Sequence, residues 1–299
     1  MGHHHNHTHD LQNQSERNIA IAFFLNFAFT IIEIVGGLLT NSTAILADAV
    51  HDLGDTLAIA LSWVLQRVSK KQASTRFSYG YRRLSLLAAF INASILLIGS
   101  VWILSEAIPR LFEPQMPVAE GMIGLAILGI FVNGFAAWRL QHGQSMNEKV
   151  LNWHLLEDVL GWVAVLIVSL VLLIYPLAIL DPLLSIGFTL FILLNVFKNL
   201  KQTVYLFLQS VPSETLYSEI EASLKNLPHV ADLHHLHLWS LDGEKHVLTA
   251  HLELNAAIQA QQQTELKTQL NKTMAPFNLA HTTIEFEFPK EECRDAHQH

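Results

Sequence analysis

The stretch STAILADAVHDLGD, residues 42–55, places ionisable side chains inside a segment that is otherwise apolar. On a helix, four of them fall within an arc of about 100°: Asp48, His51, Asp52 and Asp55. His51 and Asp55 stand one helical turn apart and share a face. Ionisable groups within a membrane are costly and normally face a polar cavity. The stretch therefore predicts a membrane helix with one polar, functional face.

The composition supports a membrane protein. Of the 299 residues, 51% are hydrophobic and 15% are charged, whereas soluble proteins carry about 25% charged residues. The formal net charge of −8 has the wrong sign for a phosphate-binding surface, so no nucleic-acid partner is expected. The only cysteine, Cys293, excludes an internal disulfide framework and a Cys-rich zinc module.

Apolar segments long enough to cross a lipid bilayer occupy the first two thirds of the chain. We expect six transmembrane helices, at 18–39, 43–67, 82–108, 117–140, 150–174 and 178–206, the third ending at Pro109. The predicted organisation is a His-rich tail (1–16), a six-helix transport domain (17–208), a soluble domain (209–290) and a C-terminal tail (291–299).

The soluble domain has the pattern of an α+β sandwich. A helix near 213–226 precedes strands near 230–240 and 245–254, and a helix over 256–275 precedes a strand at 282–288. Asp242-Gly243 between the first two strands is a hairpin signal. The predicted order is therefore α-β-β-α-β.

Basic residues concentrate in the loops on one side of the membrane, the largest group being Arg67, Lys70, Lys71, Arg76, Arg82 and Arg83 between the second and third helices. By the positive-inside rule these loops and both termini are cytoplasmic. The compact chain and short loops favour a bacterial inner membrane, with the membrane of a eukaryotic organelle as the alternative.

The fifth apolar segment has the same polar pattern as the second: His154 and Asp158 again stand one helical turn apart. Two such pairs can supply two nitrogens and two oxygens, a set that fits tetrahedral Zn²⁺. Their two carboxylates would cancel the charge of the ion. Because such ligands bind metal only when deprotonated, metal entry expels protons and metal exit readmits them. Glu157 adds a third carboxylate beside the second pair.

These residues resemble the cation diffusion facilitator family, in the version of bacterial zinc transporters with a His-rich N-terminus. The resemblance covers nearly the whole chain. It rests on residues 42–51 with Asp55, Tyr79–Leu84, Asn152 with His154 and Asp158, Asp181–Ser185, Val211-Pro212, His234–Ser240 and Thr283–Glu287.

The resemblance implies a metal–proton antiporter with six membrane helices, a cytoplasmic metallochaperone-like (ferredoxin-like) domain and alternating access in a homodimer. It assigns His51, Asp55, His154 and Asp158 to the transport site. One histidine on each helix is the zinc-preferring version, with Cd²⁺ or Co²⁺ tolerated. By the resemblance, Asp48 lies beside the site. Asp48, Asp52 and Glu157 are our candidates for supporting the ligands or carrying protons. This chain departs from the family pattern at Ser85, Glu157 and His235.

The resemblance also implies a cytoplasmic zinc site at His234, His251 and Glu287. Strand alternation places Glu285 and Glu287 on a polar face, whereas His234 shares its parity with Leu236 and Leu238. His237 could be a ligand, support one, or pack.

Both tails carry further metal-binding side chains: His3, His4, His5, His7, His9, Cys293, His297 and His299. We interpret them as modulators that scavenge metal, with a second cytoplasmic centre as the alternative for the C-terminal three.

The interpretation that accounts for most residues is secondary active efflux of Zn²⁺ by metal–proton antiport. A membrane metalloenzyme would need an open metal position and a general base, and only Glu157 is available as a base. A membrane-anchored metal sensor would leave the intramembrane carboxylates unexplained.

Overall fold

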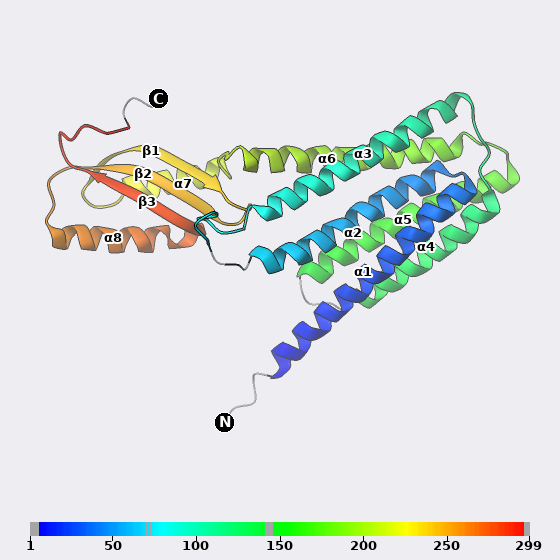
Figure 1. Cartoon of the computed structure of the whole chain (residues 1–299), viewed down its shortest axis with the longest axis horizontal. Coiled ribbons are helices and arrows are strands. Elements are labelled where there is room, and N and C mark those ends of the chain that lie inside the picture. Colours follow the sequence, from blue (N-terminus) through cyan, green and yellow to red (C-terminus); the bar gives the residue numbers. More distant parts are fainter. Residues whose placement is uncertain (1–5, 70, 72, 141–145, 296–299) are drawn as a thin grey trace. The chain divides into compact units, whose positions relative to one another are not determined.

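The computed structural model describes residues 6–69, 71, 73–140 and 146–295. The chain divides into two compact units, of which the first comprises Met1–Val64 with Ala88–Leu200. The second comprises Leu65–Leu87 with Lys201–His299. Figure 1 shows long helices in the first unit and a small sheet with helices in the second.

The first unit is built on six long helices: α1 (Asn6–Thr40), α2 (Thr43–Ser69), α3 (Leu84–Phe112), α4 (Ala119–Leu140), α5 (Met146–Ile174) and α6 (Leu180–Phe207). Five of them are long and apolar enough to span a membrane. The helix below this threshold is α2, because its aspartates and histidine lower its hydropathy. Large apolar side chains such as Phe24, Ile98 and Leu194 are exposed on the helices, as expected of a surface in contact with lipid.

Several helix boundaries differ from the sequence prediction; α5 begins at Met146 instead of residue 150, and the last predicted helix begins at Ala260 instead of residue 256. The third helix does not stop at Pro109 but continues to Phe112. Pro109 removes one backbone donor, but the last turn still forms because the N–H of Glu113 donates to the Pro109 carbonyl. The ion pair between Arg110 and Glu106, at 2.8 Å, spans the proline. The first helix begins at Asn6 rather than at residue 18, because no glycine or proline separates the His-rich segment from the apolar run.

Helix packing in the first unit depends on small residues at close contacts. A Cβ atom at Gly129 of α4 would collide with the ring of Trp162 on α5, which is fully buried. Gly99 of α3 approaches Val50 of α2 in the same way. Asn26 of α1 donates a hydrogen bond to Thr56 of α2, as expected of a polar residue that joins membrane helices.

A buried carboxylate holds the beginning of α2. Asp181, in the first turn of α6 and 1% exposed, accepts hydrogen bonds from the hydroxyls of Ser42 and Thr43 and from the backbone N–H of Thr43 and Ala44. Ser185 donates to the Thr43 carbonyl at 3.0 Å. Since the first N–H groups of a helix have no partner within the helix and carry its positive dipole end, Asp181 caps α2 from another helix.

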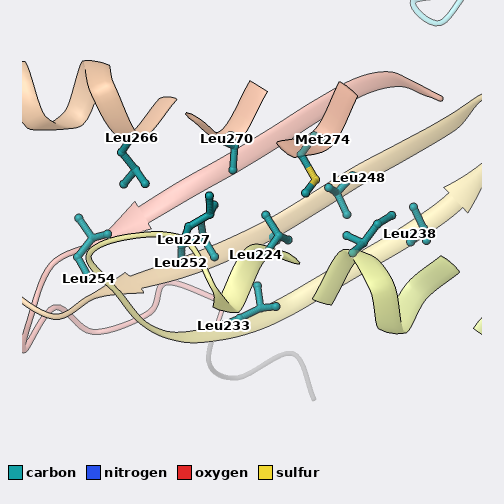
Figure 2. Close-up of a cluster of buried hydrophobic side chains, with 12 residues drawn as sticks. Leu224, Leu227, Leu233, Leu238, Leu248, Leu252, Leu254, Leu266, Leu270 and Met274 are labelled. Atoms are coloured by element: carbon teal, nitrogen blue, oxygen red, sulfur yellow. The ribbon is translucent and has the colours of Figure 1, made fainter. Parts of the chain in front are cut away.

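The second unit has the predicted α-β-β-α-β order. It contains α7 (Glu214–Lys225), β1 (Val230–Ser240), β2 (His246–Leu254), α8 (Ala260–Met274), the short helix η1 (Ala275–Phe277) and β3 (Leu279–Glu287). The sheet order is β1-β2-β3, with β1 antiparallel and β3 parallel to β2. Leucines from both helices and the sheet form one core, drawn in Figure 2. Leu248 and Leu252 of β2 are completely buried in it.

A β-bulge in β1 reverses the alternation of side chains. His234 pairs with His251, but His237 pairs with Thr249, so β1 has one extra residue between these pairs. His235 occupies the bulge with φ +48°, in the left-handed region. The parity argument for His234 fails at this point, and His234 lies on the face of His251, opposite the core.

The connection between α2 and α3 belongs to the second unit. Arg82 forms an ion pair of 3.2 Å with Asp242 in the β1–β2 turn. The same aspartate accepts hydrogen bonds from the N–H groups of Glu244 and Lys245, and Gly243 supplies a φ of +96°. This is the hairpin turn that Asp242-Gly243 predicted.

Candidate metal centres

The first candidate centre lies in the helical unit, where the His-Asp pairs of α2 and α5 meet. Nε2 of His154 is 3.0 Å from Oδ2 of Asp55, and Nδ1 of His51 is 3.5 Å from the same oxygen. The rings of His51 and His154 are 5.4 Å apart and nearly perpendicular. One ligand atom of each of these three residues lies within 4.8 Å of the others. The arrangement can hold a divalent cation.

Asp158 lies at the edge of this group. Its Oδ2 is 3.8 Å from Nε2 of His154, and the residue is 4% exposed. The structure thus brings together three of the four residues that the sequence assigned to this site and places the fourth against them.

Further carboxylates surround the centre. Asp48 and Asp52 of α2 and Glu33 of α1 are all buried, and one carboxylate oxygen of Asp48 has no hydrogen-bond partner among the described residues. Their side chains interact electrostatically with one another and with Asp158. Glu157 differs, because it is exposed on α5.

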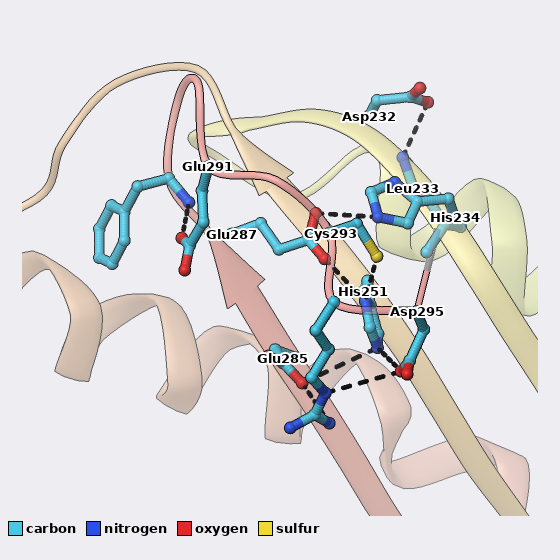
Figure 3. Close-up of polar contacts among 11 residues, drawn as sticks. Asp232, Leu233, His234, His251, Glu285, Glu287, Glu291, Cys293 and Asp295 are labelled. Atoms are coloured by element: carbon cyan, nitrogen blue, oxygen red, sulfur yellow. Dashed lines mark hydrogen bonds and ion pairs between the residues drawn. The ribbon is translucent and has the colours of Figure 1, made fainter. Parts of the chain in front are cut away.

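The second candidate centre lies on the outer face of the sheet, drawn in Figure 3. Each strand contributes one side chain: His234 from β1, His251 from β2 and Glu287 from β3. The Glu287 carboxylate is 2.9 Å from Nε2 of His234 and 2.7 Å from Nδ1 of His251. Glu287 lies on the face of β3 that the alternation predicted, opposite the core, but only 5% of it is exposed. The residues after β3 cover it.

Cys293 joins this group from the segment after β3. Its Sγ lies 3.4 Å from Nδ1 of His251, and one ligand atom of each of the four residues lies within 4.8 Å of the others. Sequence reasoning assigned Cys293 to a scavenging tail or a separate centre. No local signal could have placed it here, because the contact depends on the turn that follows β3.

The protonation of this second centre reflects its neighbours. Desolvation raises the pKa of the Cys293 thiol, and the adjacent Glu287 carboxylate raises it further. Desolvation raises the pKa of Glu287 itself. Hydrogen bonds from Cys293, His251 and His234 nevertheless hold this pKa below the ordinary value. The carboxylate is therefore ionised and is ready to bind a cation.

The other predicted metal-binding residues lie apart from these groups or are not described. The ring of His237 is 6.4 Å from that of His235, and His237 is outside the four-residue group. His7 and His9 lie in the first turns of α1, with side chains outside the described part. His3, His4, His5, His297 and His299 lie outside the described residues.

Comparison with known protein families matches both units. The model of the cation efflux transmembrane domain matches residues 19–208, which include every residue of the first centre. The chain belongs to the cation efflux (cation diffusion facilitator) family. The model of the cation efflux cytoplasmic domain matches residues 212–288, which include three residues of the second centre and end before Cys293. Family membership makes the chain a transporter rather than an enzyme.

Relatives in the cation efflux family resemble the chain over its full length. The zinc transporter ZitB of Pectobacterium atrosepticum is 33% identical over 98% of this chain and 91% of its own length. The metal cation efflux system protein CzcD of Cupriavidus metallidurans is 33% identical over 98% of this chain and 93% of its own. A Bacillus subtilis protein named cadmium, cobalt and zinc/H⁺-K⁺ antiporter is 26% identical over 100% of this chain and 94% of its own.

Proposed function

We propose that this cation efflux protein exports Zn²⁺ from the cytoplasm in exchange for protons, and that His51, Asp55, His154 and Asp158 bind the ion during transport. The observation that carries the proposal is the 3.0 Å approach of His154 on α5 to Asp55 on α2. It joins two pairs that are far apart in the sequence into a single set of ligands.

The ligand chemistry favours Zn²⁺. Two imidazoles and two carboxylates match a tetrahedral zinc site, and they cancel the charge of a divalent ion. Imidazole nitrogens also disfavour Mg²⁺ and Ca²⁺, which prefer oxygen ligands. The names of the relatives include zinc, cadmium and cobalt, so Cd²⁺ and Co²⁺ are alternative substrates.

Proton exchange follows from the same ligands. Imidazole and carboxylate must be deprotonated to hold metal, so release of the ion frees them to take protons. Asp48 and Asp52 are buried beside the site and either orient its ligands or pass protons to it. Glu157 is exposed and would act only through its charge. A relative named as an antiporter agrees with this coupling.

The proposed setting is a bacterial inner membrane with both termini in the cytoplasm. The basic residues of the loops support this orientation. The domain matched at residues 212–288 is cytoplasmic in the family and forms the homodimer. The histidines of the two tails would raise the local concentration of metal without taking part in the transport path.

The second centre is proposed as a resident zinc site that regulates the transporter. His234, His251 and Glu287 present two nitrogens and a carboxylate from three adjacent strands. Because a buried charge is costly unless it is paired, the buried, ionised Glu287 favours binding of a cation. His237 would support the site from the same face of the sheet.

The experiment is a flux measurement in proteoliposomes with an imposed pH gradient, recording internal zinc and internal pH together. Zinc movement coupled to opposite proton movement is expected, and Asp158→Asn should abolish both. Glu120→Gln is the matched control, because Glu120 is an exposed carboxylate in the first turn of α4. Zinc flux indifferent to the gradient would contradict antiport, and bound zinc without flux would contradict transport.

A further inference from the structure

The segment that follows β3 returns toward the sheet. The N–H of Glu291 donates to the Phe288 carbonyl, and the Glu291 side chain accepts from the N–H of Phe288. Lys290 adopts a φ of +73° between them. This turn reverses the chain just beyond Glu287, so that Cys293 comes to lie beside His251 in Figure 3.

We propose that Cys293 is the fourth ligand of the cytoplasmic centre, which makes it a closed, thiolate-containing site for Zn²⁺ or Cd²⁺. The inference deepens the regulatory site proposed above for His234, His251 and Glu287. It adds a residue from outside the matched cytoplasmic domain, which ends at residue 288.

The distances suit a single tetrahedral ion. Zinc lies about 2.0 Å from nitrogen or oxygen and about 2.3 Å from sulfur, so its ligand atoms are roughly 3.3–3.8 Å apart. Those of the centre are separated by 2.7 Å, 2.9 Å and 3.4 Å in the three contacts given above. All four ligand atoms lie within 4.8 Å of one another, and widening the two shorter contacts by roughly half an ångström would admit the ion.

The charges also balance. Two neutral imidazoles, one carboxylate and one thiolate cancel a divalent cation, which matters because Glu287 and His251 are 95% and 92% buried. A thiolate shifts the preference of the site toward Zn²⁺ and Cd²⁺ and away from Mn²⁺ and Mg²⁺. Four protein ligands leave no open position, which is the pattern of a structural or sensing site.

The ligands differ in how firmly the protein holds them. His234, His251 and Glu287 stand on three paired strands. Cys293 is held by its turn and by the adjacent Arg294, which pairs with Glu285 at 2.7 Å and with Asp295 at 3.6 Å. Because Arg294 is 71% exposed, these pairs contribute little stability. The bound ion would therefore fix the segment to the sheet.

Cys293 is the only cysteine of the chain, which makes the test specific. The full-length protein is titrated with Co²⁺, and the thiolate-to-cobalt charge-transfer absorption is recorded. We expect this band to saturate at one Co²⁺ per chain, to disappear in Cys293→Ser and to remain in Asp158→Asn, which alters only the transport site. Zn²⁺ should abolish the band by displacing Co²⁺.

A second measurement follows alkylation of Cys293 by iodoacetamide. At a Zn²⁺ concentration about ten times the Kd, the reaction should slow roughly tenfold, because only the metal-free thiol is available for alkylation. The protection should be lost in His251→Ala and kept in His281→Ala, a control on β3 whose ring contacts Thr283 instead.

Either of two outcomes would overturn the inference. If Co²⁺ binds to the sheet histidines without a charge-transfer band, the centre has three protein ligands and Cys293 is not one of them. If the band survives both His234→Ala and His251→Ala, Cys293 binds metal elsewhere. Neither outcome affects the flux measurement of the transport site, so the two proposals fail independently.

Discussion

Asp55 on α2 lies within 3.0 Å of His154 on α5 and within 3.5 Å of His51 on its own helix, through the same carboxylate oxygen. That oxygen is therefore the point at which the two His-Asp pairs meet. The Asp55 carboxylate therefore joins the ligands of α2 and α5 into one group.

Replacing Asp55 by Asn should reduce zinc efflux to the background of empty liposomes. The amide keeps the shape of the side chain but loses the charge that a divalent cation needs inside the membrane. Loss of a direct ligand should weaken zinc binding by more than the roughly 10–100-fold that loss of a hydrogen-bond partner behind a ligand costs. Flux of zinc into proteoliposomes checks the expectation, with Glu120→Gln as the control. Normal flux through a correctly inserted Asp55→Asn variant would show that the site is elsewhere.

Replacing Asp181 by Ala should lower the thermal stability of the helical unit, because donors at the start of α2 would lose their charged acceptor. Hydrogen bonds to a charged group contribute about 1.5–3 kcal/mol each, so a loss of roughly 3 kcal/mol is expected. Ser185→Ala is the matched variant, since it removes one neutral bond and should cost about 1 kcal/mol. Melting in detergent measures both, and equal melting temperatures would argue against the cap.

Replacing Gly129 by Ala should destabilise the contact between α4 and α5. The added methyl group would collide with the buried Trp162 ring, and overpacking costs about 1–3 kcal/mol. Gly124→Ala is the control on the same helix, because no atom of the described part of the chain lies within 4 Å of its Cβ position. Alanine is favoured in helices by up to about 1 kcal/mol, so this variant should melt at the same temperature or higher. A higher melting temperature for Gly129→Ala than for Gly124→Ala would contradict the close contact between Gly129 and Trp162.

Replacing His235 by Val should disturb β1 more than replacing it by Asn. Both substitutions remove the imidazole, but only Asn tolerates the φ of +48° at the bulge. The left-handed conformation costs other residues roughly 1–2 kcal/mol. Hydrogen–deuterium exchange of the full-length chain should show faster exchange of β1 in His235→Val than in His235→Asn. Equal exchange would mean that the bulge does not depend on this residue.

The sequence anticipated the parts of the protein that depend on neighbours along the chain. Apolar segments of membrane length predicted all six helices of the first unit, and strand alternation with Asp242-Gly243 predicted the order of the second. The spacing of His51 with Asp55 and of His154 with Asp158 predicted which side chains share a helical face. The sequence predicted the helix ends less accurately. At Pro109 one backbone donor is missing, but the helix continues because the next turn still forms its hydrogen bond.

The sequence by itself thus determined the helices and strands and the two His-Asp pairs of metal ligands, since both follow from the periodicity of helices and strands. Only the tertiary structure decided which pairs meet. It brought His154 of α5 to Asp55 of α2, turned His234 to the face of His251 through a bulge, and returned Cys293 to the sheet. These contacts join residues distant in sequence, and they depend on how helices pack and where a strand gains a residue, which no local pattern encodes.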